Sequence, residues 1–365
     1  MLRAYLPPLI ISALISGGLT YYVKVMAEKF RLFDQPSPRK IHPRPLPRLG
    51  GVAIVITFLI VILGYALASP RLTFGPGQIW FLDKKILAML SGLLLLLIVG
   101  IIDDIRGVGP VQKLFWQIVA ASIVVSAGVS ISFLRLPFGS HLDLTTLNFP
   151  FCFGGNCFQI EIWADLLSVF WIVLLVNTFN FLDGLDGLAG GIALIAVGVI
   201  FFLSVSLGQD ANALLAIIIF GVTLGFLPWN FNPARIFLGD SGSMALGYLV
   251  GVLAMISGGK LATSFLVLGI PVLDVGWVIL RRLFMGISPL RADRRHLHHR
   301  LLTAGLSQKQ AVLLLYLISA IFGSIAVISK TNAKITATVF LIGLMAALAL
   351  TLVILELRRR GNKNA

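Results

Sequence analysis

Long apolar runs separated by short polar segments extend over almost the whole chain. A helix needs about 20 mostly apolar residues to cross the hydrocarbon core of a bilayer, and in lipid it satisfies its own backbone polar groups. Eleven runs approach this length: 4–23, 49–69, 86–102, 114–134, 166–182, 188–207, 211–228, 241–259, 261–280, 310–329 and 335–355. The pattern predicts an all-α polytopic membrane protein with about eleven transmembrane helices.

The segments between these runs are short, none exceeding about 35 residues, whereas a folded domain typically needs at least about 50. We therefore predict a single integral-membrane domain over residues 1–365. The composition agrees, since 58% of the residues are hydrophobic and only 12% are charged, against about 25% in a soluble domain. Residues 1–23 lack a clear signal-peptide cleavage site, so we interpret them as part of the first span.

Lysine and arginine are distributed unequally over the two sides that eleven spans would create. One side holds 21 of the 29 residues of these two types. Because cytoplasmic loops are enriched in lysine and arginine, we place the N-terminus outside and the C-terminus in the cytoplasm. The net charge of +14 fits this explanation better than a nucleic-acid surface, and we expect no nucleic-acid partner.

The largest outer segment, 135–165, contains two stretches in which apolar and polar residues alternate, with a glycine-containing turn between them. This pattern is typical of two strands joined by a turn, so we predict a short outer β-hairpin near residues 142–162. Cys152 and Cys157 flank the turn. They could form a disulfide in an oxidising compartment, but two unpaired cysteines are equally compatible with the sequence.

Acidic residues gather on the predicted cytoplasmic side. The set consists of Asp103, Asp104, Asp183, Asp186, Asp240 and Asp293, with Asp274 toward the cytoplasmic end of the ninth run. Ionisable groups at membrane depth are costly and are usually functional. A miscount of one span would divide this set between the two sides, so its placement on one side supports the predicted topology.

The stretch between the fifth and sixth runs, Asn177–Gly191, carries the densest polar cluster. Asn177 and Asn180 lie within two helical turns before Asp183, and Asp186 follows three residues later. Glycines after both aspartates allow tight turns and close backbone approach to a ligand, and the next helix begins with free N–H groups that suit a phosphate. The alternative, in which Asp186 is only an N-cap, explains one aspartate but not the cluster.

Two further aspartate sites adjoin the same side. Asp103 and Asp104 end the third run, where adjacent carboxylates repel each other unless they share a cation. A divalent metal or a general base would explain them, and so would a solvated helix end or pairing with Arg106. Asp240 opens the eighth run in a turn of glycine and serine, where Asp240 or Ser241 could also act simply as the helix cap.

Two basic loops complete this side. The loop 33–51 contains five prolines, which exclude a continuous helix, together with Arg39, Lys40, His42 and Arg48. These residues fit either a membrane-surface segment attracted to anionic lipid or a strap that binds phosphate.

The second basic loop contains His296, His298 and His299 and five arginines from Arg282 to Arg300. A histidine-rich tract can bind zinc, but no cysteine lies on this side, and the aspartates favour a hard, oxygen-preferring cation such as Mg²⁺. An anionic ligand is therefore the better explanation for the loop. Phosphoryl transfer needs mainly positioning and charge stabilisation, and a site at the membrane edge would let a lipid-borne phosphate meet a soluble diphosphate.

Six motifs follow one another along the chain. They are Asp34-x-Pro-x-x-Arg-Lys-x-His with Pro47-Arg-x-Gly-Gly51, Asp103-Asp104 with Lys113-x-x-x-Gln117, Asn177-x-x-Asn-x-x-Asp-Gly-x-Asp-Gly187, Gly239-Asp-x-Gly-Ser243, Pro271-x-x-Asp274, and His296-Leu-His-His299. In this order they resemble the motifs of the polyprenyl-phosphate N-acetylhexosamine-1-phosphate transferases, a family-4 type of glycosyltransferase. The resemblance covers nearly the whole chain.

The resemblance implies that undecaprenyl phosphate attacks the β-phosphate of a UDP-N-acetylhexosamine, giving a lipid diphosphate sugar and UMP, with Mg²⁺ or in its place Mn²⁺. It implies catalytic roles for Asp103, Asp104, Asp183 and Asp186, and metal binding by Asp240 and Asp183. It implies substrate binding by Arg39, Lys40, His42, Arg48, Lys113, Asn177, Asn180, Asp274, His296, His298 and His299.

The resemblance also implies a multi-pass protein of the bacterial inner or plasma membrane, with a cytoplasmic active site for the first membrane step of a cell-envelope polysaccharide. The His-x-His-His loop is similar to that of enzymes that use UDP-GlcNAc; UDP-MurNAc-pentapeptide or another UDP-N-acetylhexosamine is the alternative. A transporter, a less favoured explanation, would place its acids near the bilayer midplane, often within inverted repeats. The expected partners are the bilayer, the lipid phosphate and the UDP-sugar, and the oligomeric state is open between monomer and homodimer.

Overall fold

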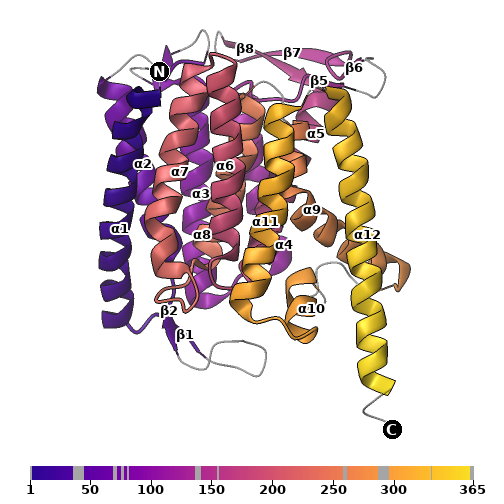
Figure 1. Ribbon diagram of the computed structural model, residues 1–365. Coiled ribbons are helices and arrows are strands. Elements are labelled where there is room, and N and C mark those ends of the chain that lie inside the picture. Colours follow the sequence, from indigo (N-terminus) through magenta and orange to yellow (C-terminus); the bar gives the residue numbers. More distant parts are fainter. Residues whose placement is uncertain are drawn as a thin grey trace.

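The computed structural model describes residues 2–35, 45–68, 72–74, 78–79, 82–135, 141–153, 156–257, 261–286, 296–329 and 331–361. It is mostly helical, with the long helices side by side (Figure 1). After a short 3₁₀ helix, Leu2–Tyr5, the helices are α1 (Leu6–Lys29), α2 (Gly50–Ala68), α3 (Lys84–Arg106), α4 (Pro110–Ser126), α5 (Ile162–Leu182), α6 (Leu188–Ser206), α7 (Asp210–Asn230), α8 (Gly239–Ile256), α9 (Leu261–Phe284), α10 (Leu297–Thr303), α11 (Gln308–Ile328) and α12 (Thr331–Gly361).

Nine helices in the described part of the chain are long and apolar enough to cross a membrane: α1, α2, α3, α5, α6, α7, α8, α9 and α11. In α4 and α12 the apolar helical stretches are shorter, 110–126 and 336–348. The chain is thus a mostly helical, multi-pass membrane protein, as the apolar runs predict. Each of the eleven runs overlaps one of these helices.

The expected span 114–134 is wrong at its C-terminal end, because α4 stops at Ser126. Gly128 follows with a φ of +86°, a left-handed backbone that glycine adopts without strain and that ends the helix. Residues 133–135 then form a strand. The apolar side chains continue past Gly128, so hydropathy alone did not reveal the turn.

Helix α8 lies at the centre of the bundle, and every residue from Ser241 to Met255 is buried. It packs against α2, α3 and α5. The backbones approach closely at its start: a Cβ atom on Gly51 would lie 2.1 Å from the backbone nitrogen of Gly242, and one on Gly100 would lie 2.4 Å from the Cα of Ser241. Because no side chain fits at these crossings, the first turn of α8 is fixed against α2 and α3.

Helix α1 lies at one edge of the bundle and packs along α7 (Figure 1). A Cβ atom on Gly225 would lie 2.2 Å from the carbonyl oxygen of Ala13, and the Ser16 hydroxyl donates a 2.6 Å hydrogen bond to the carbonyl of Val222. Small residues that admit close backbone contact, with a hydroxyl bonding across, are typical of helix pairs in lipid. The pairing fixes α1 against α7 at the edge of the bundle.

Short antiparallel strand pairs lie at the two ends of the bundle. They are β1 (Phe33–Asp34) with β2 (Leu46–Pro47), β3 (Gln78–Ile79) with β4 (Leu82–Asp83), β5 (Phe133–Arg135) with β6 (His141–Asp143), and β7 (Asn148–Phe153) with β8 (Asn156–Glu161). The strands β5 to β8 lie at the end where the N-terminus is, and β1, β2 and α10 lie at the opposite end (Figure 1). Cys152 and Cys157 are register partners in the β7–β8 backbone.

Candidate functional site at the first turn of α8

Asp240, in the first turn of α8, is the residue on which polar side chains from several helices converge. Its Oδ1 accepts a 3.1 Å hydrogen bond from Lys113 Nζ on α4 and a short one from Asn180 Nδ2 on α5. Asn180 Nδ2 also lies 3.1 Å from Ser243 Oγ. The structure therefore brings together three site residues predicted from separate motifs: Asp240, Lys113 and Asn180.

Asp103, near the end of α3, faces the same lysine. Its Oδ2 forms an ion pair with Lys113 Nζ, and its Oδ1 accepts a 2.7 Å hydrogen bond from the backbone N–H of Val108. The Asp103 side chain is nearly buried, at 7% exposed, and that of Lys113 is 19% exposed. One ammonium group thus bridges two carboxylates, Asp103 and Asp240, in partial isolation from water, which strengthens each charge interaction.

Asp104, the next residue, points instead at the backbone of α8. Its Oδ1 accepts from the backbone N–H of Asp240 at 2.9 Å, and its Oδ2 accepts from the backbone N–H and the hydroxyl of Ser241 at 3.1 and 2.8 Å. The first N–H groups of a helix have no partner within the helix, and here a carboxylate from α3 supplies it. Neither Asp240 nor Ser241 caps α8, since the cap position is Leu238 and carries no side-chain hydrogen bond.

Asp183 follows the last residue of α5 and lies near the start of α8, where the backbone of Gly239 and the carboxylates of Asp240 and Asp104 influence its charge. Burial raises the pKa of Asp183 well above its usual value of 3.8, and the nearby Asp240 and Asp104 carboxylates raise it further. A carboxyl group with this environment gains most from a bound cation, because the cation removes the repulsion that disfavours its charged form.

Asp186 has a different environment, although it lies only three residues further along the chain. Its Oδ2 accepts from Asn232 Nδ2 at 2.9 Å and from the backbone N–H of Ala234 at 3.1 Å. These donors belong to the segment between α7 and α8. The N-cap of α6 is Gly187, so the alternative that Asp186 caps this helix is wrong. Asp186 instead fastens the loop after α5 to the segment that leads into Asp240.

Three polar residues that the sequence analysis missed hold the same loop. Asn230 Oδ1 accepts a 3.1 Å hydrogen bond from the backbone N–H of Gly187, and its Nδ2 donates to the carbonyl of Ile236 at 3.0 Å. The Tyr316 hydroxyl on α11 donates to the carbonyl of Gly187. Asn232 Nδ2 also lies 2.8 Å from Gln308 Oε1. Isolated asparagine and tyrosine residues carry no motif, so these contacts could not be predicted from the sequence.

Asn177 lies deeper in the bundle than Asn180. Its Nδ2 donates to Gln117 Oε1 at 2.6 Å and to the carbonyl of Val173 at 2.8 Å. Gln117 is buried and also contacts the sulfur of Met244 at 3.7 Å. The structure therefore joins Asn177 to α4 and α8 and assigns it a packing contact, one layer behind Asp240.

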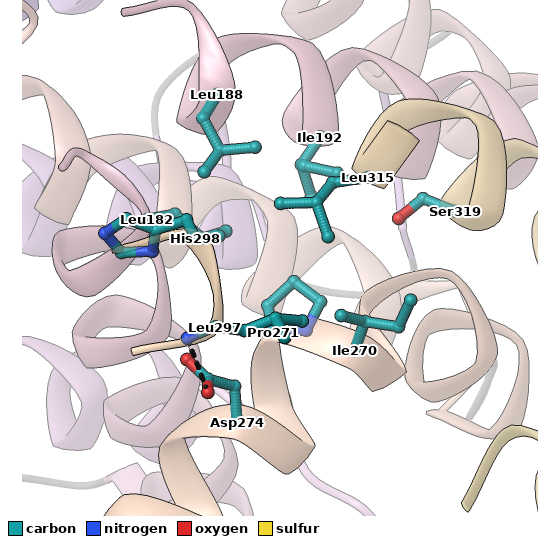
Figure 2. Close-up of a pocket in the computed structure, with 10 residues that line it drawn as sticks. All are labelled: Leu182, Leu188, Ile192, Ile270, Pro271, Asp274, Leu297, His298, Leu315 and Ser319. Carbon is teal, nitrogen blue, oxygen red and sulfur yellow. Dashed lines mark hydrogen bonds between the residues drawn. The ribbon is translucent and has the colours of Figure 1, made fainter. Parts of the chain in front are cut away.

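The three histidines form a separate cluster beside Phe181. Asp274 Oδ2 lies 2.9 Å from His296 Nδ1. Figure 2 shows Asp274 beside Leu297, whose backbone N–H donates a 2.9 Å hydrogen bond to Asp274 Oδ1. His296 stacks on Phe181 at 4.9 Å between ring centroids and is parallel to His298 at 5.9 Å. The His298 and His299 rings lie 4.3 Å apart. Asp274 on α9 thus fixes the start of α10 and its ring stack.

His298 connects this cluster to the loop after α5. A Cβ atom on Gly184 would lie 2.5 Å from His298 Nε2, so the glycine is needed for the imidazole to approach the backbone. His298 is 4% exposed. Burial lowers the pKa of His298 well below its usual value of 6.5, and the neighbouring His299 and His296 lower it further. The ring is therefore neutral near pH 7.

The cavity behind the histidines is too small to be the substrate site. It measures about 20 Å³ and is lined mainly by apolar side chains, among them Leu182, Leu188 and Leu315, with His298 and Asp274 at one side (Figure 2). A volume of this size holds at most about one water molecule. This cavity is therefore too small for any ligand much larger than water.

The basic strap is described only in part. Arg48 forms an ion pair with Asp34 and donates to the carbonyl of Asp104 at 3.4 Å, which places it next to the α3–α8 junction. The remaining predicted residues of this strap, Arg39, Lys40 and His42, lie outside the described residues, as does Asp293.

The residues around Asp240 fit a magnesium ion of the kind that phosphoryl-transfer enzymes use. Among the described residues, no group of three or more His, Cys, Asp or Glu side chains forms a complete metal cage. Mg²⁺, however, is usually held by one or two carboxylates, and water and substrate phosphates fill the other positions. Asp240, in the first turn of α8, and Asp183, whose pKa the Asp240 charge raises, are donors of the right type.

Comparisons with known proteins give one consistent result. The family model described as glycosyl transferase family 4 matches residues 86–258. A probable undecaprenyl-phosphate N-acetylglucosaminyl 1-phosphate transferase of Bacillus subtilis is 35% identical, over 91% of this chain and 87% of the relative. A decaprenyl-phosphate N-acetylglucosaminephosphotransferase of Mycolicibacterium smegmatis is 33% identical, over 97% and 89%. An undecaprenyl-phosphate alpha-N-acetylglucosaminyl 1-phosphate transferase of Escherichia coli K12 is 26% identical, over 85% and 80%.

Proposed function

The chain belongs to glycosyl transferase family 4, and from this premise we propose that it transfers N-acetylglucosamine 1-phosphate from UDP-GlcNAc to undecaprenyl phosphate. Relatives that are 35% and 33% identical are named as transferases of N-acetylglucosamine phosphate to undecaprenyl or decaprenyl phosphate. The observation that carries the proposal is the convergence of Asp103, Lys113, Asn180 and Asp240 beside Asp183 at one end of a membrane bundle.

The reaction exchanges one phosphoanhydride bond for another. An oxygen of the lipid phosphate attacks the β-phosphorus of UDP-GlcNAc, the bond between the α- and β-phosphates breaks, and UMP leaves with the bridging oxygen. The products are undecaprenyl-diphosphate-GlcNAc and UMP. Negative charge accumulates on the phosphate oxygens during transfer, so the protein contributes chiefly by positioning and by charge stabilisation.

In this scheme Lys113 is the cation, among the described residues of the cluster around Asp240, that we assign to the reacting phosphates. Asp103 and Asp240 hold its ammonium group in place, and Asn180 holds Asp240. Asp183 and Asp240 are the proposed ligands of Mg²⁺, which when bound would neutralise the diphosphate. Asp104 and Asp186 act on the backbone and are positioning residues. His296, ordered by Asp274 and Phe181, would contact the sugar nucleotide.

We place this end of the bundle in the cytoplasm, at the inner face of the cell membrane. It carries Arg48, Lys113 and the histidine loop, and the excess of lysine and arginine assigned to this side supports the orientation. With α4 and α12 also spanning, eleven helices put the N-terminus outside and the C-terminus inside, and the two chain ends lie at opposite ends of the bundle (Figure 1). The β7–β8 hairpin then faces outside.

The test is a UMP-release assay on purified protein in nanodiscs with undecaprenyl phosphate and a panel of UDP-sugars. We expect release with UDP-GlcNAc that requires Mg²⁺ and falls by about 10²–10³-fold in Asp240→Asn, the scale of removing one preorganised electrostatic group. Asp210→Asn is the matched control, because Asp210 is exposed at the other end of α7. Full activity in EDTA or in Asp240→Asn would refute the site, and no UMP from any UDP-sugar would refute the reaction.

A further inference from the structure

A groove on the outside of the bundle lies at the C-terminal end of α7, apart from the cluster around Asp240. It measures about 440 Å³, which is within the range of about 300–1,000 Å³ that small-molecule sites occupy. Its apolar wall consists of Leu224, Leu227, Pro228 and Phe231. Leu224 is 39% exposed, so the wall is open to whatever surrounds the helix.

The groove has an apolar part and a charged end. Leu224 lies six residues before Asn230, the last residue of α7, which is about 9 Å along a helix at 1.5 Å per residue. Arg235 follows the helix and lines the other end of the groove. Because α7 spans the bundle, the apolar part lies at membrane depth and the arginine lies at the membrane edge.

Arg235 is held in place by an aromatic ring and by its own backbone. Its Cζ lies 5.8 Å from the centre of the Trp229 ring, and its backbone N–H donates to the carbonyl of Trp229 at 2.8 Å. Trp229 in turn packs against Tyr21 of α1 at 5.9 Å between centroids. Among the described residues no carboxylate pairs with Arg235. Tryptophan and tyrosine are enriched where membrane meets water, so these rings mark the headgroup level.

We propose that this groove binds one anionic phospholipid, with an acyl chain along Leu224 and Leu227 and the headgroup phosphate at Arg235. A guanidinium group forms two parallel hydrogen bonds to phosphate oxygens, and the position of the Arg235 guanidinium over the Trp229 ring keeps it at this end of the groove. Charge complementarity favours an anion over a second copy of this chain, which carries a net charge of +14. Cytoplasmic leaflets are rich in anionic lipid, in keeping with the orientation proposed above.

The bound lipid would act on the segment that leads to the reacting residues. Asn232 lines the groove and donates hydrogen bonds to Asp186 and Gln308. The same segment, 231–238, runs directly into Gly239 and Asp240. An occupied groove would therefore stabilise the Asn232–Asp186 contact and the start of α8, and lipid composition would influence the stability of this end of the bundle.

The test measures thermal unfolding of the full chain in detergent micelles titrated with phosphatidylglycerol or with phosphatidylcholine. We expect phosphatidylglycerol to raise the midpoint more than phosphatidylcholine does, and Arg235→Gln to lose at least half of that difference. Lys29→Gln removes one positive charge from an exposed residue in the last turn of α1, at the same end of the bundle. This control variant should keep the full difference between the two lipids. Leu224→Trp, which fills the apolar part, should also lose the effect without changing the charge.

Three outcomes would overturn the proposal. The first is an Arg235→Gln protein that keeps the full phosphatidylglycerol effect, and the second is an equal loss in Lys29→Gln, which would show a general charge effect. The third is a midpoint that responds to undecaprenyl phosphate but not to phosphatidylglycerol, which would assign the groove to the lipid substrate. The measured quantity is the thermal midpoint and not turnover, so the result tests lipid binding independently of the proposed reaction.

Discussion

The end of α3 and the loop between α5 and α6 each carry two aspartates, and the members of each pair have different partners. At the end of α3, Asp103 faces Lys113, whereas Asp104 accepts hydrogen bonds from the first turn of α8. In the loop, Asp183 faces Asp240 and Gly239, whereas Asp186 accepts from Asn232 and Ala234. Each region therefore supplies one carboxylate to the polar cluster around Asp240 and one to the backbone that supports this cluster.

The comparison also shows how the two supporting carboxylates differ. Asp104 accepts hydrogen bonds directly from the N–H groups of Asp240 and Ser241, so it acts on the residue at the centre of the polar cluster. Asp186 bonds to the segment before that residue, through one side chain and one backbone group. A substitution of Asp104 should therefore displace Asp240 directly. A substitution of Asp186 should displace Asp240 less, because Asn230 also joins the loop to the segment before α8.

The largest effect should separate Asp103 from Asp104. Asp103→Asn keeps an acceptor for the backbone N–H of Val108 but removes one of the two negative charges that hold Lys113. UMP release should therefore fall by about 10²–10³-fold, with little change in the free energy of unfolding. Asp104→Asn places an N–H group against the N–H groups of α8. It should cost about 1–3 kcal/mol of stability, the scale of an unsatisfied buried hydrogen-bonding group.

Turnover and urea unfolding measured on the same preparations decide this comparison. Asp104→Ser, which is too short to reach α8, should resemble Asp104→Asn in stability, and Asp210→Asn should leave both quantities unchanged. If Asp103→Asn proves to be the unstable variant and Asp104→Asn the inactive but stable one, the assignment of the two carboxylates is reversed.

The helices could be predicted because each buried or lipid-facing segment is a continuous apolar run, and length alone then favours a span. Figure 1 shows those runs as the long helices. The end of α4 could not, since the residues after Gly128 are as apolar as those before it. The clustering of Asp240, Asn180 and Lys113 followed from topology and resemblance together.

The different partners of the two aspartates in each pair could not be predicted from the sequence. They depend on α3 meeting the first turn of α8, 136 residues further along the chain from Asp104 to Asp240, and hydropathy and spacing say nothing about that contact. The same holds for Asn230 and Tyr316, which meet the loop through tertiary packing alone. In the sequence, a close approach of two helices is marked only by small residues such as Gly51. The need for glycine at this position becomes clear only in the structure, where α8 packs against it.

The second effect should separate Asp183 from Asp186. Asp183→Asn removes a proposed metal ligand and should lower turnover by about 10²-fold. Asp186→Asn keeps one acceptor and should lower it by no more than about 10-fold, with a loss of about 1 kcal/mol in stability. Raising the Mg²⁺ concentration should restore part of the activity of a weakened metal site. A titration of Mg²⁺ should therefore increase the turnover of the Asp183 variant but not that of the Asp186 variant. Equal responses of the two variants would contradict the distinction.

The smallest effect is a pH dependence of stability from His298, which touches the same loop at Gly184. Its folded pKa lies well below 6.5 because the ring is buried and faces His299 and His296, while Asp274 holds His296 on the same stack. Above pH 6.5 the ring is neutral in both states and contributes no pH dependence. As the pH falls through 6.5, only the unfolded chain takes up the proton, so stability should fall, by at most about 1.4 kcal/mol per pH unit. Urea unfolding at pH 7.5, 6.5 and 5.5 should show this slope in the wild type and a shallower one in His298→Gln. An unchanged slope in that variant would mean that other groups carry the dependence and that the His298 ring is not held neutral against Gly184.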